Sequence, residues 1–551
     1  MKKLYLFTLL NLFVASSQAQ YFQWAKAEGL WAYDYGYGTG LDNAGNLYVA
    51  GKYELNAIFS GSTVTNHGTN HDIYLAKYTP SGSLMWVQTG GGTLGDYAHA
   101  MYCDGSSAVY TAGEIEGLNA QITFPGSAIT LTCVGDNDLY LSKYDLNGTL
   151  LWAKSEGWYG SEKALGITAD NTGNVYVCGY FTDTTKFNGV QVNGKGNHDI
   201  FIAKYNSSGV FQWVKTAGSV GRDEAKGVKC DASGNVYICG MYSNSAYFNA
   251  QTTLTCTAGY FDAFVAKYDP SGNMLWIKRG SSDYDDVAWS ITMDSQGKIY
   301  TAGEFVGYGI FGNQNVTTAG ATDAFVACYD ASGNEQWVKR AGGSQIDRVR
   351  GIGTDGTNLF ITGQFGSTAS FGSQSVTSAD SSDIFVSAMD NTGSFLWTAT
   401  VGGPADSLET LGYESGNSVI GDASGNVYAT GSLLNGGVFS GFNVPHYTRT
   451  DAFVTKLNST PQGIRENYLK ENIAIYPNPS NGIFNLDVSR YPNETLEVTT
   501  YNSMGQKVAS VIHKPSSSIN VDLVSQPNGI YFVEIKTTSR VVDKQKIIVQ
   551  H

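Results

Sequence analysis

Charged residues, proline and closely spaced cysteines are all scarce in this chain. Charged residues make up 15% of the 551 residues and only 11 residues are proline, so the composition indicates neither a disordered polar chain nor a collagen or proline-rich linker. The seven cysteines form no CxxC pair, which leaves a zinc or thioredoxin-like site without support. Most of them lie in apolar runs, and we interpret them as buried hydrophobic side chains.

An excess of basic residues is also missing. The formal net charge is −14, and an acidic surface repels both phosphate backbones and anionic lipid. We therefore expect no nucleic-acid partner. Beyond the N-terminus no segment approaches the 18 or so consecutive apolar residues of a membrane-spanning helix, so we also expect no transmembrane segment.

The N-terminus is typical of a secretory signal peptide. Two lysines, Lys2 and Lys3, precede an apolar run over residues 4–15, and Ser17-Gln18-Ala19 places small residues where signal peptidase cleaves. We predict a signal peptide over residues 1–19, cleaved before Gln20, and hence export to the periplasm.

The residues that are abundant favour an all-β fold. The chain holds 66 glycines, 35 tyrosines and 25 phenylalanines. Aromatic side chains suit pleated, half-buried strands, and glycine suits tight turns.

Three independent markers repeat along the chain with one period of 60 to 68 residues. The first is a tryptophan, at 24, 86, 152, 213, 276, 337 and 397. The second is a glycine that ends an apolar run, at 51, 113, 179, 240, 303, 363 and 431. The third is an aspartate that opens another apolar run, at 72, 138, 199, 262, 323, 383 and 451. A shared period in three markers indicates a repeat architecture.

Each repeat contains four short apolar segments separated by turn residues. In the third repeat these are residues 163–170, 175–180, 199–205 and 211–215. Four antiparallel strands in each of seven repeats predict a seven-bladed β-propeller over residues 20–458.

The two ends of the repeat region fit together. The mature chain begins with a tryptophan segment, residues 21–26, and the last repeat ends at residues 451–456 without one. We expect the first segment to pair with the last as the outer strand of blade seven, which closes the ring and removes two exposed edges.

The repeats resemble a known bacterial family. The pattern GNxYxxG followed by DxFxxKYDxSGxxxW, seen best from Asp262 to Trp276, is similar to the seven-bladed β-propeller repeat (SBBP) family. Cys328 and Ala388 replace the lysine of the pattern in two repeats. The resemblance implies the propeller fold but no particular activity, because propellers carry many functions.

The last part of the chain has a different pattern. We predict a linker over 459–472 and a small β-sandwich over 473–551. Its ordered motifs contain Tyr476, Pro477, Asn478, Pro479, Gly482, Gly505, Gly529 and Tyr531. These motifs resemble the C-terminal sorting domain of the type IX secretion system of Bacteroidetes. The resemblance implies export across the outer membrane, removal of the domain, and attachment to the cell surface or release.

A carboxylate stands eight residues before the end of the first strand in every repeat. In a propeller this strand is innermost, so we expect the carboxylates to form a ring around one mouth of the central channel. The ring could bind a cation, or each carboxylate could cap the backbone of the loop that leads into its strand. Sevenfold repetition favours capping. The residues are Asp34, Asp96, Glu162, Asp223, Asp286, Asp347 and Glu414.

The residues that follow these carboxylates alternate in character. The second and fourth are small, whereas the first and third are often large and differ between repeats. Aromatic residues mixed with basic ones are typical of a binding surface, although packing between blades would also explain them. The candidate ligand-binding residues are Tyr35, Tyr37, Tyr97, His99, Lys163, Glu224, Lys226, Trp289, Arg348 and Arg350.

No catalytic motif stands out, and we predict neither a catalytic residue nor a cofactor, apart from the cation that the acidic ring could bind. Our leading hypothesis is a secreted or cell-surface binding or scaffold protein. Its expected partners are the type IX secretion machinery and an unknown extracellular glycan or protein. Two alternatives stay open: an extracellular propeller enzyme acting on glycan through carboxylates at the channel mouth, and a structural surface-layer component.

Overall fold

The computed structural model describes most of the chain as β-strands. Its described residues are 22–29, 32–256, 260–379, 381–402, 414–434, 436–439, 442–444, 449–458, 473–489, 491, 494–502, 507–513, 518–537 and 541–551. These residues contain no helix, so the predicted all-β class is confirmed. The chain divides into two compact units, Met1–Pro461 and Gln462–His551. The predicted signal peptide and linker lie outside the described residues.

The first unit is built from repeated sheets in which four strands pair antiparallel in the order first, second, third, fourth. The first strands are β2 (Tyr35–Leu41), β8 (Asp96–Cys103), β14 (Glu162–Ala169), β20 (Glu224–Cys230), β26 (Val287–Met293), β32 (Arg348–Thr354) and β38 (Ser415–Gly421). The second strands are β3 (Leu47–Glu54), β9 (Ala108–Glu116), β15 (Val175–Phe181), β21 (Val236–Ser243), β27 (Ile299–Phe305), β33 (Leu359–Phe365) and β39 (Asn426–Leu434).

The outer half of each sheet follows the same scheme. The third strands are β6 (His71–Tyr78), β12 (Asn137–Asp145), β18 (Asp199–Tyr205), β24 (Phe261–Tyr268), β30 (Asp323–Tyr329), β36 (Asp383–Met389) and β42 (Thr450–Asn458). The fourth strands are β7 (Leu84–Gly90), β13 (Leu150–Glu156), β19 (Phe211–Ala217), β25 (Met274–Ser281), β31 (Glu335–Gly343), β37 (Phe395–Val401) and, from the N-terminus, β1 (Phe22–Glu28).

A short hairpin connects the second and third strands of each repeat. The hairpins are β4 (Ala57–Phe59) with β5 (Ser62–Val64), β10 (Gln121–Thr123) with β11 (Thr130–Thr132), β16 (Thr184–Phe187) with β17 (Val190–Asn193), β22 (Ser245–Tyr247) with β23 (Thr253–Thr255), β28 (Tyr308–Phe311) with β29 (Gln314–Thr317), β34 (Thr368–Phe371) with β35 (Gln374–Thr377), and β40 (Gly437–Phe439) with β41 (Phe442–Val444).

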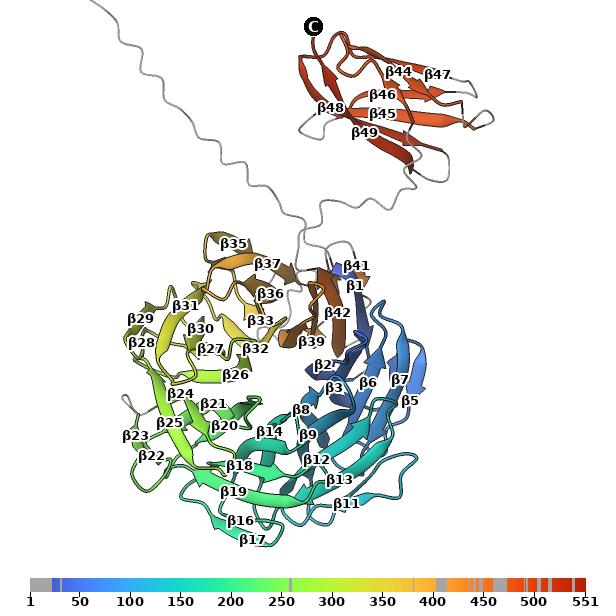
Figure 1. The fold of residues 1–551 in the computed structure, drawn as a ribbon. Helices are drawn as coiled ribbons and strands as arrows, with labels where there is room; N and C mark the ends of the chain where they lie inside the picture. The colour runs from blue at the N-terminus through green and yellow to red at the C-terminus, as the bar shows by residue number, and fades with distance from the viewer. Residues whose placement is uncertain are drawn as a thin grey trace, which may run out of the picture. The chain divides into compact units, whose positions relative to one another are not determined.

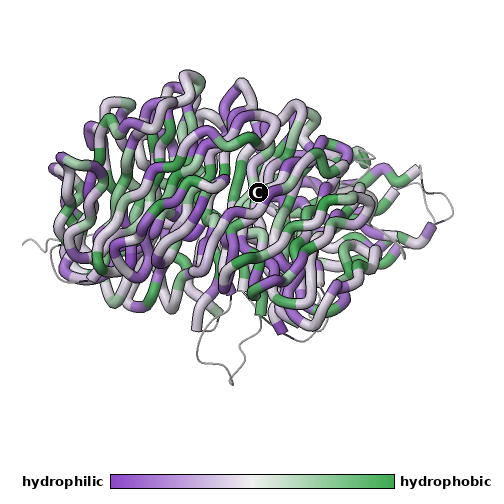
Figure 2. Tube along the Cα trace, turned by 90° about the horizontal axis from the view of Figure 1, so that it is seen from below, coloured by the Kyte–Doolittle hydropathy of each residue, from purple (hydrophilic) through white to green (hydrophobic). Residues whose placement is uncertain are grey.

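The sheets lie side by side around a common centre, with their first strands toward it (Figure 1). These innermost strands contact one another in the order β2, β8, β14, β20, β26, β32 and β38, and β38 contacts β2 again. Hydrophobic and hydrophilic residues alternate along many of the strands (Figure 2). This β-propeller-like arrangement buries apolar side chains between neighbouring sheets.

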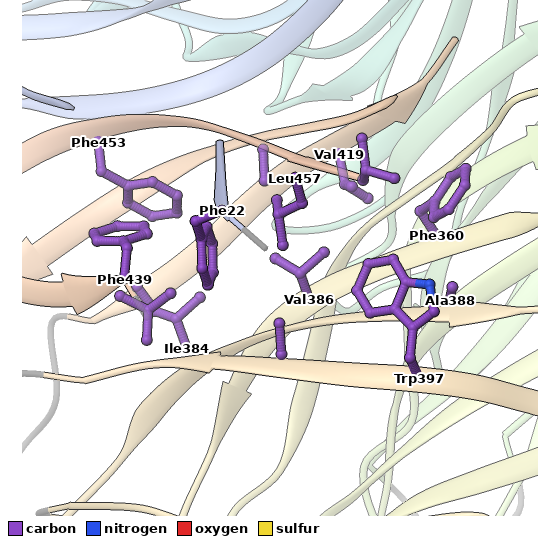
Figure 3. Packing of buried hydrophobic residues seen from close by; sticks show 14 of the residues in the cluster. Phe22, Phe360, Ile384, Val386, Ala388, Trp397, Val419, Phe439, Phe453 and Leu457 are labelled. Carbon is purple, nitrogen blue, oxygen red and sulfur yellow. The ribbon is translucent and has the colours of Figure 1, made fainter. Parts of the chain in front are cut away.

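The N-terminal strand is the fourth strand of the last sheet, as predicted. Trp24 lies opposite Lys456 of β42, and Lys26 lies opposite Val454. Phe22 is 4% exposed, and its ring meets that of Phe439 edge to face at a centroid distance of 5.1 Å (Figure 3).

The repeated tryptophans join neighbouring sheets. Trp213 of β19 donates a hydrogen bond from Nε1 to the carbonyl oxygen of Pro270, 3.2 Å away in a turn of the next sheet. Lys204 of β18 donates to the same oxygen, also at 3.2 Å. The ring of Tyr176, opposite Lys204 on β15, is 5.1 Å from the ammonium and 6.3 Å from the indole. The repeated tryptophans therefore hold neighbouring sheets together.

The DxxGN turns are hairpin turns held by their own aspartate. Asp231 accepts hydrogen bonds at Oδ1 from the backbone amides of Ser233 and Asn235, each at 2.9 Å, and at Oδ2 from the side-chain amide of Asn235 at 2.7 Å. This is an Asx-type turn. Five of the seven cysteines are buried, in line with their interpretation as hydrophobic side chains.

The second unit contains two sheets that pack face to face. One has the strand order β43 (Ile475–Tyr476), β44 (Ile483–Asp487), β47 (Ser518–Asp522); the other has the order β46 (Lys507–His513), β45 (Leu496–Asn502), β48 (Gly529–Lys536), β49 (Val541–Val549). Their inward side chains, such as Phe484, Leu486, Val498 and Val533, form one buried cluster. This is the β-sandwich that the sequence predicted.

We predict that Phe22→Ala lowers the free energy of unfolding of the first unit by about 3–5 kcal/mol, because the change empties a buried aromatic site in the last sheet. Gln23→Ala is the matched control, since Gln23 is exposed on the same strand, and it should change stability little. Chemical denaturation measures both. Equal stability of the two variants would show that the N-terminal strand is not docked.

Candidate functional site

A cavity of about 840 Å³ occupies the centre of the first unit. Every innermost strand contributes side chains to its wall: β2, β8, β14, β20, β26, β32 and β38. A cavity of this size is in the usual range for a small-molecule or oligomer site.

A β-bulge interrupts every innermost strand at the same repeat position. In β20, for example, the register shifts between Ala225 and Gly227, which leaves Lys226 without a partner on β21. A bulge re-aims the extra residue, and here the extra residue of every repeat lines the cavity. These residues are Tyr37, His99, Leu165, Lys226, Trp289, Arg350 and Asn417.

The structure brings most of the predicted ligand-binding residues into this wall. Those that line the cavity are Tyr35, Tyr37, His99, Lys226, Trp289, Arg348 and Arg350. The other three stand directly behind them: Tyr97 stacks on His99 at 5.6 Å, and Lys163 and Glu224 belong to the ion pairs described below.

One side of the cavity mouth is aromatic. Tyr35 and Tyr37 of β2 stack with ring centroids 5.8 Å apart, and Tyr37 lies 5.7 Å from His99 of β8. The ammonium of Lys52 sits between the rings of Tyr35 and Tyr97, at 4.7 and 4.6 Å. Burial lowers the pKa of Lys52 to about 8.

The opposite side is rich in cations around one indole. Lys226, from the innermost strand before β26, lies 4.7 Å from the ring centre of Trp289. Arg350, from the strand after it, lies 3.8 Å from the same ring. Burial lowers the pKa of both cations.

Two glutamates that the sequence analysis missed hold these walls in place. Glu114 of β9 binds His99 at 2.9 Å and Lys163 at 2.7 Å. Glu304 of β27 accepts a hydrogen bond from Nε1 of Trp289 at 2.9 Å and pairs with Arg348. Burial opposes ionisation of Glu114, but the bonds to His99 and Lys163 outweigh it and lower its pKa to about 2.

A signal for these glutamates was present in the sequence. Both directly follow the repeated glycine of the second strand, and this position varies from repeat to repeat as the bulge position does. Its residues are Lys52, Glu114, Tyr180, Met241, Glu304, Gln364 and Ser432.

Glu224 is a further ionised carboxylate at the edge of the site. It is fully buried and pairs with His198 at 2.7 Å and with Arg222 and Lys226. Burial raises its pKa, but these three partners together lower it to about 2.

The ring of seven carboxylates does not line the cavity. Each is buried, with an exposed fraction of 3% or less. Asp223 shows what they do: it accepts bonds from the backbone amides of Ser219 at 2.7 Å and Ser243 at 2.8 Å. Asp347 does the same for Gly343 at 2.7 Å. These bonds support the capping interpretation, and a bound cation stays a prediction.

Burial opposes ionisation of several of these carboxyl groups. It raises the pKa of Asp96 to about 9, of Glu162 to about 8 and of Asp347 to about 7. The neighbouring carboxylate of Asp72 raises that of Asp96 further.

Two short protein-sequence similarities concern parts of the chain. An uncharacterized WD repeat-containing protein of Acanthamoeba polyphaga mimivirus is 28% identical over 166 residues, which cover 27% of this chain and 12% of that protein. The regulatory protein FlaEY of Caulobacter vibrioides is 25% identical over 171 residues, which cover 29% of this chain and 18% of that protein. The chain thus spans less than a fifth of the length of these relatives.

A structural similarity adds nothing further. A glycoside hydrolase family 32 structure from Bifidobacterium adolescentis aligns over 96% of this chain and 95% of its own, with a TM-score of 0.22 and 10% identity. So low a TM-score carries no argument about fold or activity.

The C-terminal unit matches a family model described as the secretion system C-terminal sorting domain, over residues 474–550. This confirms the predicted sorting domain of type IX secretion and supports export by that route. Among the described residues there is no helix that is long and apolar enough to cross a membrane.

The structure places the sorting motif beside the last strand of the chain. Asn478 accepts a hydrogen bond from the amide of Ile548 and donates one to the carbonyl of Lys546, both at 2.9 Å. Gly482 has a φ of +99°, which disfavours any side chain there. Tyr531 is buried and donates to the carbonyl of Pro527 at 2.7 Å. Gly505 lies outside the described residues.

We predict that Asp96→Asn weakens the pH dependence of stability. Because its pKa is higher in the folded chain, Asp96 stabilises the fold fully only below about pH 4, and this contribution is lost as pH rises toward 9. The free energy of unfolding should therefore fall less in the variant than in the natural chain between about pH 5 and pH 8.5. Denaturation at several pH values measures this.

Asp104→Asn is the control for that experiment. Burial raises the pKa of Asp104, but hydrogen bonds from Ser107 and its neighbours outweigh burial and lower it. Its contribution is therefore lost only as pH falls below its ordinary range. If both variants show the same slope in the alkaline range, burial of Asp96 does not control its ionisation.

Proposed function

We propose that this chain is an exported seven-bladed β-propeller, closed by its N-terminal strand, that binds an extracellular ligand in its central cavity. After signal-peptide-dependent passage to the periplasm, the type IX secretion machinery would carry it to the cell surface or the medium. The confirmed sorting domain supports the export route. The pairing of β1 with β42 supports closure.

One observation carries the binding proposal. The bulge position of every repeat faces the same cavity, yet the residues differ. Between them they offer phenol, imidazole, ammonium, indole and guanidinium groups. A scaffold needs the same residue from every blade, whereas a ligand without sevenfold symmetry needs different ones.

The cavity wall favours binding over glycan hydrolysis. Hydrolysis requires two carboxyl groups on either side of the scissile bond. Among the described lining residues the carboxylates are Asp231 and Asp294, and both accept backbone hydrogen bonds within their own turns. A glycan-cleaving enzyme and a surface-layer component are therefore the weaker proposals.

The binding proposal is tested with a paired variant. Once an array of polysaccharides and proteins has identified a ligand, Trp289→Ala with Arg350→Ala should weaken its binding by about 2–4 kcal/mol while the melting temperature changes little. The control is Tyr308→Ala with Arg279→Ala, which removes an exposed aromatic and an exposed arginine outside the cavity. Loss of binding in the control pair alone would place the site elsewhere.

The export proposal is tested by removing residues 473–551. Because the sorting domain lies within this segment, the truncated chain should remain in the periplasm. Cell fractionation with surface labelling measures its location, and full-length chain in the same cells is the control. Normal amounts of truncated protein at the surface would contradict the proposal.

A further inference from the structure

Two basic side chains of the cavity wall have no carboxylate in ion-pair contact. Five basic side chains line it. Three of these have carboxylate partners: His99 binds Glu114, Lys226 binds Glu224, and Arg348 binds Glu304. The other two are Arg350 and Lys229, and within the described part of the chain neither has a carboxylate within the 4.0 Å of an ion pair.

Arg350 and Lys229 contact aromatic rings instead. The guanidinium of Arg350 lies over Trp289 at 3.8 Å, and the ammonium of Lys229 lies 5.4 Å from the ring centre of Tyr102. Stacking uses the face of a guanidinium and leaves the N–H groups in its plane free to donate. Burial lowers the pKa of both side chains, and for Arg350 it outweighs the opposing effect of the Glu304 carboxylate.

The acidic residues of the wall form no ion pair with these two cations. Asp231 accepts two backbone amides of its own turn and the hydroxyl of Tyr237. Asp294 likewise accepts the amides of Gln296 and Lys298. Their oxygens are already used by the fold, although the chain as a whole is strongly acidic.

The two cations lie at different depths of the cavity. Arg350 occupies the bulge position of its strand, and Lys229 stands three residues beyond the bulge position of β20. At about 3.3 Å per residue the two positions are roughly 10 Å apart along the strands. A ligand that reaches both must be longer than a simple inorganic anion.

We propose that the central cavity binds a short acidic oligosaccharide, whose carboxylate or sulfate groups pair with Arg350 and Lys229. Its sugar rings lie against the aromatic wall of Tyr35, Tyr37 and His99, because the carbon-bearing face of a sugar ring is apolar and aromatic side chains supply the apolar lining of ligand pockets. The inference rests on the proposed function and adds the ligand class to it.

The charge of the protein favours a short ligand over a long polyanion. A net charge of −14 repels a highly charged polymer such as nucleic acid before it reaches the cavity. An oligosaccharide with few charges meets less of this repulsion and still reaches both cations.

The experiment is calorimetry on the full chain with three probes: a galacturonic acid trimer, a sulfated galactose trimer and a neutral galactose trimer. At least one acidic trimer should bind, and the neutral one should bind at least about 10-fold more weakly, since charged hydrogen bonds contribute that much. The affinity should also fall as salt is added. Comparison of the two acidic trimers distinguishes carboxylate from sulfate.

Two charge-removing variants locate the site. Arg350→Met and Lys229→Met should each weaken acidic-trimer binding about 10- to 100-fold. Arg279→Met and Lys267→Met are matched controls outside the cavity, and Lys267 lies over Tyr237 at 5.0 Å much as Lys229 lies over Tyr102. The controls should change affinity less than about twofold. Melting temperatures check that every variant is folded.

Each contrary result overturns the inference. These results are no binding of either acidic trimer, equal binding of the neutral trimer, or unchanged affinity in both cavity variants. A neutral ligand from the array could instead bind and lose its binding in the variant that combines Trp289→Ala with Arg350→Ala. In that case the proposed function stands and only the ligand class is wrong.

Discussion

The hydrogen bond from a tryptophan to a turn of the neighbouring sheet fixes how the sheets of the first unit stand beside one another. Trp24, Trp152, Trp213, Trp276 and Trp337 all donate from Nε1 to a carbonyl oxygen in the following repeat, at 3.2–3.3 Å. Trp24 is on the N-terminal strand, yet its acceptor is Pro80 of the first repeat. The same hydrogen bond therefore joins successive repeats and also joins the N-terminal strand, in the last sheet, to the first repeat.

This regular frame allows the cavity wall to be irregular. Buried carboxylates such as Asp223 hold the loops that lead into the innermost strands, and the bulge that follows turns one side chain of each repeat toward the centre. Because the frame does not use that side chain, it can differ in each repeat without disturbing the packing between sheets. Glu114 and Glu304, on the second strands of their sheets, then orient the bulge residues His99 and Trp289.

The C-terminal unit is a sorting domain, and its sequence alone is almost sufficient to identify it. Its motifs are local and ordered, and residues 474–550 match the sorting-domain model. The structure shows how the first motif is joined to the last strand. The side chain of Asn478 accepts one hydrogen bond from the backbone of β49 and donates another to it. The sorting domain and the central cavity therefore lie in different units.

Sequence alone determined the all-β class, the period, the pairing of the two ends of the repeat region and the sorting domain, because each depends on local patterns that recur or that mark a terminus. It also selected residues such as Tyr37 and Trp289 from their variation. It placed the seven carboxylates at the channel mouth, whereas the structure buries them. Only the tertiary structure decided that these carboxylates are buried. It also revealed the bulges, the roles of Glu114 and Glu304, and the two cations without carboxylate partners. The direction of a side chain and the charges around it depend on strands that are distant along the chain.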